Sequence, residues 1–468
     1  MTASHATAGE IAAAVAAGTT TARAVAEAAL ARIEALNPAI NAFTDVTAAR
    51  ALAEADAVDA RIRMGRDAGP LAGVPVAVKN LADIEGLATR AGSKINRERP
   101  PATRDATLVQ RLQAAGAVLL GALNMGEFAY DFTGENAHDG ACRNPHDTAR
   151  MTGGSSSGSG AAVAAGLAPV TLGSDTNGSL RVPASLCGVC SLKPTYGRLS
   201  RAGTFPFVDS LDHLGPVARS VGDIARAYDA LQGPDLADHA CAERAAEPVS
   251  PALGEGVEGL RIGVLCGWFA EEAGVEAREG VERVSEAFAG IAEVRPLMLE
   301  EAKAGRAAAY LVTNGESAAF HLDRLRARPG DFDPDTRDRF LAGALLPAAW
   351  VMRAQQVRRW WLERLMAAFA GVDLLVAPAT PFTAPLIGQK TLQIGGREVP
   401  LRPNLGLFAQ PFSSVGLPVL TVPVFAPGTL PMGIQLIAPP WREDRCIAAG
   451  AALEAAGIAK AHPPAPPA

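Results

Sequence analysis

The sequence predicts an α/β protein in which helices cover both faces of a mixed central β-sheet. Short apolar segments at residues 74–80, 261–265 and 419–424 have the length of buried strands and are bounded by turn residues. They alternate with longer segments in which Ala, Val, Ile and Leu recur at helical spacing, as is typical of a layered α/β fold. Glycine is abundant and aromatic residues make up only 5%, which suits close packing of helices on a sheet.

The N-terminal part of the chain predicts helices. Apolar residues at helical spacing over 8–36 indicate two helices, with caps supplied by the threonines at 19–21. Asn37-Pro38 should end the second helix, because the residue before a proline disfavours helical angles. Residues 46–64 predict a third helix. We therefore expect an N-terminal helical region over residues 1–65 that covers the sheet and contributes to a homodimer contact.

For the rest of the chain, the sequence predicts a core at residues 66–235 and a remainder at residues 236–468. The remainder belongs to the same α/β domain and includes the substrate-pocket helices. A Pro-, Asp- and Ala-rich loop at 233–251 joins them. The predicted helices cover residues 105–115, 160–166, 221–231 with Ser220 as N-cap, 275–289, most of 300–370, and 443–456. The predicted strands cover residues 74–80, 118–122, 168–173, 189–192, 261–265, 293–296, 372–377, 419–424 and 433–437.

Composition and charge argue against several classes of protein. A net charge of −6 gives no basic surface for nucleic acid or an anionic membrane, and no apolar run reads as a membrane span. The N-terminus lacks the basic-then-apolar layout of a signal peptide. Six cysteines in 468 residues are too few for a disulfide framework, so we expect a cytoplasmic protein.

Two smaller patterns allow both a functional and a structural interpretation. Cys187-x-x-Cys190 has the spacing of half a zinc or redox site, but it has no second pair and lies in an apolar segment, which favours two core residues. Trp360 and Trp361 stand beside several arginines, as in a nucleic-acid site, but their apolar helical pattern favours the core. No Cys/His cluster has metal-ligand spacing, so neither a metal nor a cofactor is expected.

The most informative stretch, residues 151–200, contains two Gly-flanked, hydroxyl-rich turns. The first reads GGSS at 153–156, the second reads GSDTNGS at 173–179, and an apolar run at 161–172 separates them. Glycine lets backbone N–H groups approach a ligand closely, because it has no Cβ and tolerates positive φ. A flexible Gly/Ser linker is the alternative, and the apolar sequence that follows disfavours it.

These turns resemble the signature of the amidase signature family. The family's two serine turns, followed by an Arg and a Pro, correspond here to 153–156 and 173–179 with Arg181 and Pro183, and the match continues through LKPTYG at 192–197. The resemblance covers residues 11–226 well and makes 66–235 the amidase signature core. It implies the amidase signature fold and amide hydrolysis without a metal.

Amide hydrolysis needs a nucleophile, a base and hydrogen-bond donors for the developing oxyanion. Ser179 suits the nucleophile, because a tight turn precedes it and can aim several backbone N–H groups at one point. The predicted oxyanion hole consists of the N–H groups of Thr176, Asn177, Gly178 and Ser179.

Lys79 is the predicted base. It ends an apolar strand beside uncharged loops, and burial there would lower the pKa of its amine toward neutrality. His138 and His213 are the alternative bases, although neither lies in a recognisable triad motif. The resemblance implies that Ser155 follows a cis peptide bond and carries the proton from Ser179 to Lys79.

The serine turns depart from the family pattern at two positions. Ser157 replaces a glycine common in the first turn, and Asn177 replaces the first glycine of the usual Gly-Gly-Ser. Asparagine is the non-glycine residue that best tolerates positive φ, so the turn is expected to survive. GSSSG at 154–158 also matches the nucleophile elbow of α/β-hydrolases, but residues 144–150 predict a loop where that elbow needs a strand.

Three further segments indicate a branch of the family. RAGSKIN at 90–96, YDFTGENAHDG at 130–140 and TFPFV at 204–208 resemble the branch that acts in cyanuric acid (s-triazine) breakdown. This implies ammonia release from 1-carboxybiuret to give 1,3-dicarboxyurea, and a small helical partner protein. The alternatives are another small-amide amidase, the glutaminase subunit of the tRNA-dependent amidotransferase, and an amidase-like scaffold or binding subunit without activity.

The resemblance also implies a set of substrate contacts, made by Tyr130, Ser156, Arg181, Tyr310 and Arg339. An anionic substrate requires a cation, and Arg339 would supply it. The structural alternative is that Arg339 pairs with Asp335 on a helix surface.

Overall fold

The computed structural model describes residues 5–464 and is organised around one large β-sheet. Within these residues the sheet has 11 strands in the order β1-β3-β2-β6-β8-β7-β14-β15-β11-β9-β10. These strands are β1 (Phe43–Val46), β2 (Pro75–Lys79), β3 (Val118–Leu123), β6 (Val170–Asp175), β7 (Cys190–Lys193), β8 (His213–Ala218), β9 (Arg261–Leu265), β10 (Glu293–Leu297), β11 (Leu374–Pro378), β14 (Val419–Pro423) and β15 (Gly433–Ile437). The sheet is mixed, as predicted: β2 is parallel to β3 and β6, whereas β14 and β15 are antiparallel.

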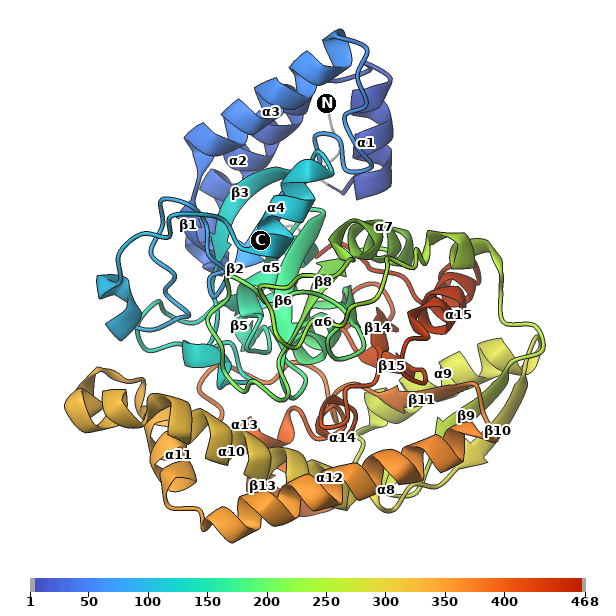
Figure 1. Cartoon of the computed structure of the whole chain (residues 1–468). Helices are drawn as coiled ribbons and strands as arrows, with labels where there is room; N and C mark the ends of the chain where they lie inside the picture. Colours follow the sequence, from blue (N-terminus) through green and yellow to red (C-terminus); the bar gives the residue numbers. More distant parts are fainter. Residues whose placement is uncertain (1–4, 465–468) are drawn as a thin grey trace.

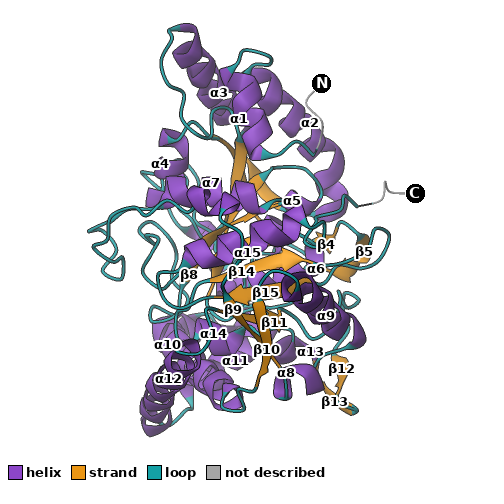
Figure 2. Ribbon diagram, turned by 90° about the vertical axis from the view of Figure 1, so that its right-hand side faces the viewer, coloured by secondary structure: helices purple, strands orange, loops and turns teal. Residues whose placement is uncertain are grey.

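Helices lie on both sides of the sheet (Figure 2). Figure 1 shows α1 to α3 at one end of the molecule and the long helices α10 and α12 at the other. The helices are α1 (Ala8–Ala16), α2 (Ala22–Ile40), α3 (Ala48–Arg63), α4 (Thr107–Ala114), α5 (Ser157–Ala164), α6 (Arg181–Cys187), α7 (Val221–Leu231), α8 (Trp268–Glu271), α9 (Val275–Ala289), α10 (Ala302–Ala327), α11 (Pro334–Ala344), α12 (Ala348–Phe369), α13 (Leu401–Asn404), α14 (Gln410–Ser413) and α15 (Glu443–Ala455).

Several predicted elements have the bounds that the sequence indicated. The helices α7 and α9 and the strands β9 and β15 begin and end at the predicted residues. The Ser220 side chain accepts a hydrogen bond from Asp223 N at 3.1 Å, as an N-cap does. Cys187, Cys190 and Trp361 are buried, as the structural interpretation of both patterns expected, whereas Trp360 is partly exposed.

The N-terminal part differs from its prediction in two ways. Helix α2 continues past Asn37-Pro38 to Ile40. A proline in the last turn removes only one helical hydrogen bond, and Asn41 then ends the helix in the left-handed conformation, with φ 56°. The chain next forms β1, which pairs with β3, so that α3 begins at Ala48 and not at Val46.

The sequence did not predict β8, although this strand lies near the centre of the sheet. Its short sequence contains Gly215 and Pro216, and proline is usual only at sheet edges or bulges. The pairing with β7 involves only Val217 and Ala218, so Pro216 lies beyond the end of that ladder. Two small hairpins were also not predicted, β4 (Arg143–Asn144) with β5 (Asp147–Met151) and β12 (Thr391–Ile394) with β13 (Arg397–Pro400).

No helix within residues 5–464 combines the length and the apolar character needed to cross a lipid bilayer.

The sheet brings the two predicted catalytic segments to one edge. The parallel strands β2 and β6 are neighbours, with Val78 opposite Leu172. Their carboxyl ends therefore meet at the same edge of the sheet, where α/β folds commonly place their sites. Lys79 is the last residue of β2, and Ser174 lies near the end of β6.

Candidate active site

Lys79 lies inside the protein with its amine between two hydroxyl groups. Its exposed fraction is 1%. The amine Nζ is 2.7 Å from Ser155 Oγ and 2.8 Å from Ser174 Oγ. Within residues 5–464, no carboxylate forms an ion pair with Nζ. The structure thus brings Lys79 and Ser155 together, as predicted, and adds Ser174.

The surroundings of Lys79 favour its neutral form. Burial lowers the pKa of Lys79 to about 7, although the more distant carboxylates of Asp212, Asp175 and Asp131 favour the charged form. An ammonium loses its hydration when it is buried, and without an adjacent carboxylate little replaces that loss. Near pH 7 the Lys79 amine is therefore neutral in a large fraction of the protein molecules and can accept a proton.

The first serine turn is held in the core by backbone contacts. The Gly154–Ser155 peptide bond is cis, as the resemblance implied. Gly154 N donates to Phe132 O at 2.9 Å, and Ser156 N donates to Ser179 O at 3.3 Å, which ties the two serine turns together. Ser156 Oγ donates to Ser174 O and accepts from Ser174 N, both at 3.1 Å. The side chain of Ser156 therefore braces the two turns and does not line the pocket described below.

Asp175 shapes the second serine turn. Its carboxylate accepts hydrogen bonds from Gly178 N at 2.7 Å and Leu180 N at 3.2 Å. Gly178 has φ 130°, and a Cβ there would lie 2.6 Å from Ala409 Cβ, so only glycine fits. The N–H of Gly178 is thus directed at Asp175, which differs from its predicted role in the oxyanion hole. In the described part of the chain, the N–H groups of Thr176, Asn177 and Ser179 have no hydrogen-bond acceptor.

Ser179 lines a small cavity of about 20 Å³. Between the Ser155 and Ser179 hydroxyl groups, no hydrogen bond is present in residues 5–464. In unliganded enzymes such contacts are often long and tighten when substrate binds. The cavity is lined by Ala129, Tyr130, Asp131, Phe132, Thr176, Asn177, Ser179, Phe207, Tyr310, Thr313, Arg339 and Gln410.

Three of the predicted substrate contacts, Tyr130, Tyr310 and Arg339, line this cavity. The guanidinium Cζ of Arg339 lies 3.5 Å from the centre of the Tyr130 ring, and Arg339 Nη1 donates to Tyr130 O at 2.7 Å. Asp335 pairs with Arg402 at 2.8 Å and not with Arg339. Among the described residues no carboxylate forms an ion pair with Arg339, so its charge is available to a ligand.

Arg181 is not brought to the cavity. Its side chain is completely buried and forms a bidentate ion pair with Asp175, with both N···O distances at 3.0 Å. It also donates to Ala409 O at 2.9 Å and to Gln435 Oε1 at 2.7 Å. Burial alone would raise the pKa of Asp175, but the Arg181 guanidinium outweighs burial and holds that pKa well below its usual range. Arg181 thus supports the turn that carries Ser179.

Replacing Arg181 with methionine should destabilise the fold by about 3–5 kcal/mol, because it leaves the Asp175 carboxylate buried without a counter-charge. Chemical denaturation checks this: the denaturant concentration at the unfolding midpoint should fall, and the dependence of the unfolding free energy on denaturant concentration should not change. The matched control is Arg337→Met, which breaks an exposed pair with Asp338 and should cost at most about 1 kcal/mol. Equal losses for the two variants would contradict the supporting role of Arg181.

Neither alternative base reaches the serines. His138 Nε2 lies 3.1 Å from Glu127 Oε1. Burial lowers the pKa of His213 well below its usual value, and its Nδ1 donates to Leu211 O at 2.6 Å. His213 Nδ1 also lies 3.0 Å from Asp175 O. Among the described residues no hydrogen bond joins either histidine to Ser155 or Ser179, whereas the Lys79 amine is hydrogen-bonded to Ser155.

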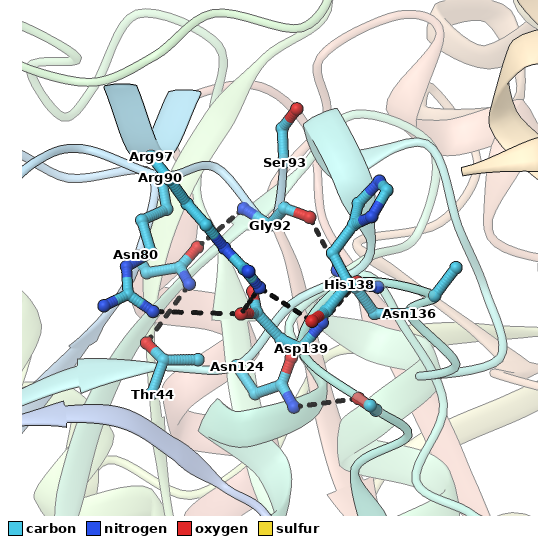
Figure 3. Close-up of polar contacts among 12 residues, drawn as sticks. Thr44, Asn80, Arg90, Gly92, Ser93, Arg97, Asn124, Asn136, His138 and Asp139 are labelled. Carbon is cyan, nitrogen blue, oxygen red and sulfur yellow. Dashed lines mark hydrogen bonds and ion pairs between the residues drawn. The ribbon is translucent and has the colours of Figure 1, made fainter. Parts of the chain in front are cut away.

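Two of the segments that indicate the branch, residues 90–96 and 130–140, lie against each other (Figure 3). Asn136 Nδ2 donates to Gly92 O at 2.8 Å, and Gly92 N donates to Asn80 Oδ1 at 3.0 Å. Asn80 Nδ2 donates in turn to Thr44 Oγ1 at 3.2 Å. Asn80 directly follows Lys79, so this network anchors the backbone at the end of β2.

Sequence reasoning missed several residues of the site. Ser174 could have been found, since it belongs to the second serine turn and is the last residue but one of β6, beside Lys79. Thr313 and Gln410 carried no signal, because they come from α10 and α14, far along the chain from both turns. Within residues 5–464, no group of three or more His, Cys, Asp or Glu side chains is placed to hold a metal ion.

The chain resembles several known proteins over nearly its whole length. The family model described as Amidase matches residues 24–447. The chain is 56% identical over 454 residues to AtzE, the 1-carboxybiuret hydrolase subunit of Pseudomonas sp. (strain ADP), which covers 96% of this chain and 98% of that protein. It is 39% identical over 471 residues to a glutamyl-tRNA(Gln) amidotransferase subunit of Chloroflexus aurantiacus (strain ATCC 29366 / DSM 635 / J-10-fl), with 94% of each covered.

A solved structure agrees with the fold. It superposes with a TM-score of 0.95 at 54% identity and covers 98% of this chain and 100% of its own. It is described as a vestigial protein complex that reveals the evolutionary origins of an s-triazine catabolic enzyme. Both sequence relatives are named as subunits.

Proposed function

This chain belongs to the amidase signature family, and on that premise we propose that Ser179, Ser155 and Lys79 carry out its amide hydrolysis. The observation that carries the proposal is the buried Lys79 amine, 2.7 Å from Ser155 Oγ and unpaired with any carboxylate of the described residues. The substrate is a small carbamoyl or urea-type compound, whose C–N bond is cleaved with release of ammonia.

The reaction proceeds in two halves. Neutral Lys79 accepts the proton of Ser155, Ser155 accepts that of Ser179, and Ser179 Oγ attacks the carbonyl carbon. The N–H groups of Thr176, Asn177 and Ser179 stabilise the oxyanion. The proton returns by the same path to the leaving nitrogen, so that ammonia departs. Water then attacks the acyl-enzyme, with the chain of groups again serving as base, and releases the acid product.

The proposed substrate is 1-carboxybiuret, which would give 1,3-dicarboxyurea. The likeness to AtzE supports this choice, and so does the uncompensated cation Arg339 beside Ser179, which suits a substrate carboxylate. Tyr310, which lines the cavity, has an exposed fraction of 43% and so lies between the cavity and the solvent.

We also propose that the chain forms a homodimer and binds a small helical partner protein. The relatives named as subunits support a partner. Large apolar side chains are exposed at Leu345, directly after α11, and at Trp350 and Met352 near the start of α12, which supports a protein contact in this part of the chain.

A panel of ammonia-release assays tests the substrate, with 1-carboxybiuret, biuret, allophanate and glutamine, each with and without the candidate partner. We expect 1-carboxybiuret to have the highest kcat/KM. Arg339→Met should lower kcat/KM for 1-carboxybiuret by about ten- to hundredfold and for uncharged biuret by less than about threefold, because only the former loses a charge-assisted hydrogen bond.

Arg337→Met is the matched control on the same helix, and its activity on both compounds should equal that of the parent. Preferred turnover of glutamine would assign the glutaminase function instead. No turnover of any compound, with or without the partner, would favour an amidase-like binding protein.

A further inference from the structure

Asn177 occupies a position where the backbone does not require asparagine. Residues that need glycine or asparagine for conformational reasons have positive φ, and Asn177 is not among the positive-φ residues of the described chain. The turn is formed as expected, but it does not draw on the tolerance of asparagine for positive φ. The reason for its presence has to lie in the side chain.

The side chain of Asn177 is fixed at one end and unsatisfied at the other. Its Nδ2 donates to Thr313 Oγ1 of α10 at 2.7 Å. Its Oδ1 is buried and has no hydrogen-bond partner within residues 5–464, although the residue lines the cavity at Ser179 with an exposed fraction of 6%. An orphaned buried acceptor is costly, which indicates that a ligand completes it.

A second orphaned group lines the same cavity. By distance and angle the Tyr130 hydroxyl forms no hydrogen bond among the described residues, although the Arg339 guanidinium lies against the Tyr130 ring, and the exposed fraction of Tyr130 is 3%. Burial raises the pKa of this phenol, so the group keeps its proton and can donate it in a hydrogen bond. The cavity therefore offers an oxygen that only accepts, a hydroxyl that can donate, and the Arg339 guanidinium.

The geometry points to Asn177 as a specificity-determining residue, whose Oδ1 accepts an N–H of the NH₂ group of a carbamoyl substituent of the substrate while the Tyr130 hydroxyl donates to that group's carbonyl oxygen. A carbamoyl group has both the donor and the acceptor that this pair requires. A carboxylate, ester or ketone lacks the N–H and leaves Oδ1 unpaired. The inference deepens the proposed function, on which it rests, by naming the substrate feature that the site recognises.

The test is direct binding, in a Ser179→Ala background that prevents turnover. Acetylurea and diacetamide are suitable probes, because they differ only in one NH₂ group replaced by CH₃. We expect the Ser179→Ala protein to bind acetylurea about ten- to hundredfold more tightly in calorimetry, as for one buried hydrogen bond. With Asn177→Ala added, the two affinities should agree within about threefold.

Two further variants separate recognition from general damage. Asn177→Asp keeps an acceptor oxygen and should restore much of the preference for acetylurea. Asn314→Ala removes the neighbouring buried asparagine of α10, which does not line the cavity, and should leave the preference unchanged.

An unchanged preference in Asn177→Ala, or equal binding of both probes by the Ser179→Ala protein, overturns the inference. So does the absence of acetylurea binding. These binding measurements do not depend on catalysis. If the parent enzyme releases no ammonia, the proposed reaction is contradicted, but the inference about Asn177 is still decided by the binding measurements.

Discussion

Ser179→Ala should lose ammonia release by about 10⁴-fold or more while the protein stays folded. The expected loss is large, because Ser179 supplies the attacking oxygen of the proposed reaction and the nearest other hydroxyl of its turn, that of Thr176, is engaged as a donor to Asp212 at 2.6 Å. The Ser179 hydroxyl takes part in no hydrogen bond within residues 5–464, so its removal should hardly change stability. Single-turnover assays check the loss of ammonia release, and thermal unfolding checks that the variant stays folded.

Ser159→Ala is the matched control for this loss. Ser159 is a buried serine of α5 whose Oγ donates to Leu172 O at 3.0 Å, away from the cavity. That variant should lose some stability and keep the parent's turnover. Normal turnover by Ser179→Ala would remove the serine from the mechanism.

Lys79→Met should lower kcat/KM by about 10²–10⁴-fold, because it removes the general base while an unbranched apolar side chain fills the space of the lysine stem. The pH dependence gives an independent check in the parent enzyme. Burial lowers the pKa of Lys79 to about 7. Below that pH the amine is protonated and cannot accept the Ser155 proton, so kcat/KM should fall as the pH drops through about 7 and level off above it.

A second lysine makes this assignment testable. Burial also lowers the pKa of Lys193 to about 7, and its Nζ donates to Pro194 O at 2.9 Å. Within residues 5–464 it forms no hydrogen bond with Ser155 or Ser179. In Lys193→Gln, kcat/KM should therefore still fall as the pH drops through about 7, as in the parent enzyme. Absence of that fall in Lys193→Gln, or near-parental activity of Lys79→Met at neutral pH, would assign the base to another group.

Much of the fold followed from local chemistry. A strand buried on both faces needs a short continuous apolar run, and a surface helix needs apolar residues at helical spacing, so β9, β15, α7 and α9 could be placed to the residue. The centre of the sheet was harder, because β8 contains Gly and Pro and has no periodic pattern of its own. Its place between β6 and β7 depends on pairing with strands distant in the sequence.

By itself the sequence determined that a lysine ends a buried strand and that two serines lie in glycine-rich turns, because these are properties of a few consecutive residues. Only the tertiary structure decided which groups meet. It buried Arg181 against Asp175, left Arg339 without a carboxylate partner among residues 5–464, and joined Asn177 to Thr313 across 136 residues of chain. The physical reason is that hydrogen bonding and burial of a polar side chain depend on neighbours brought together by packing, which no local pattern records.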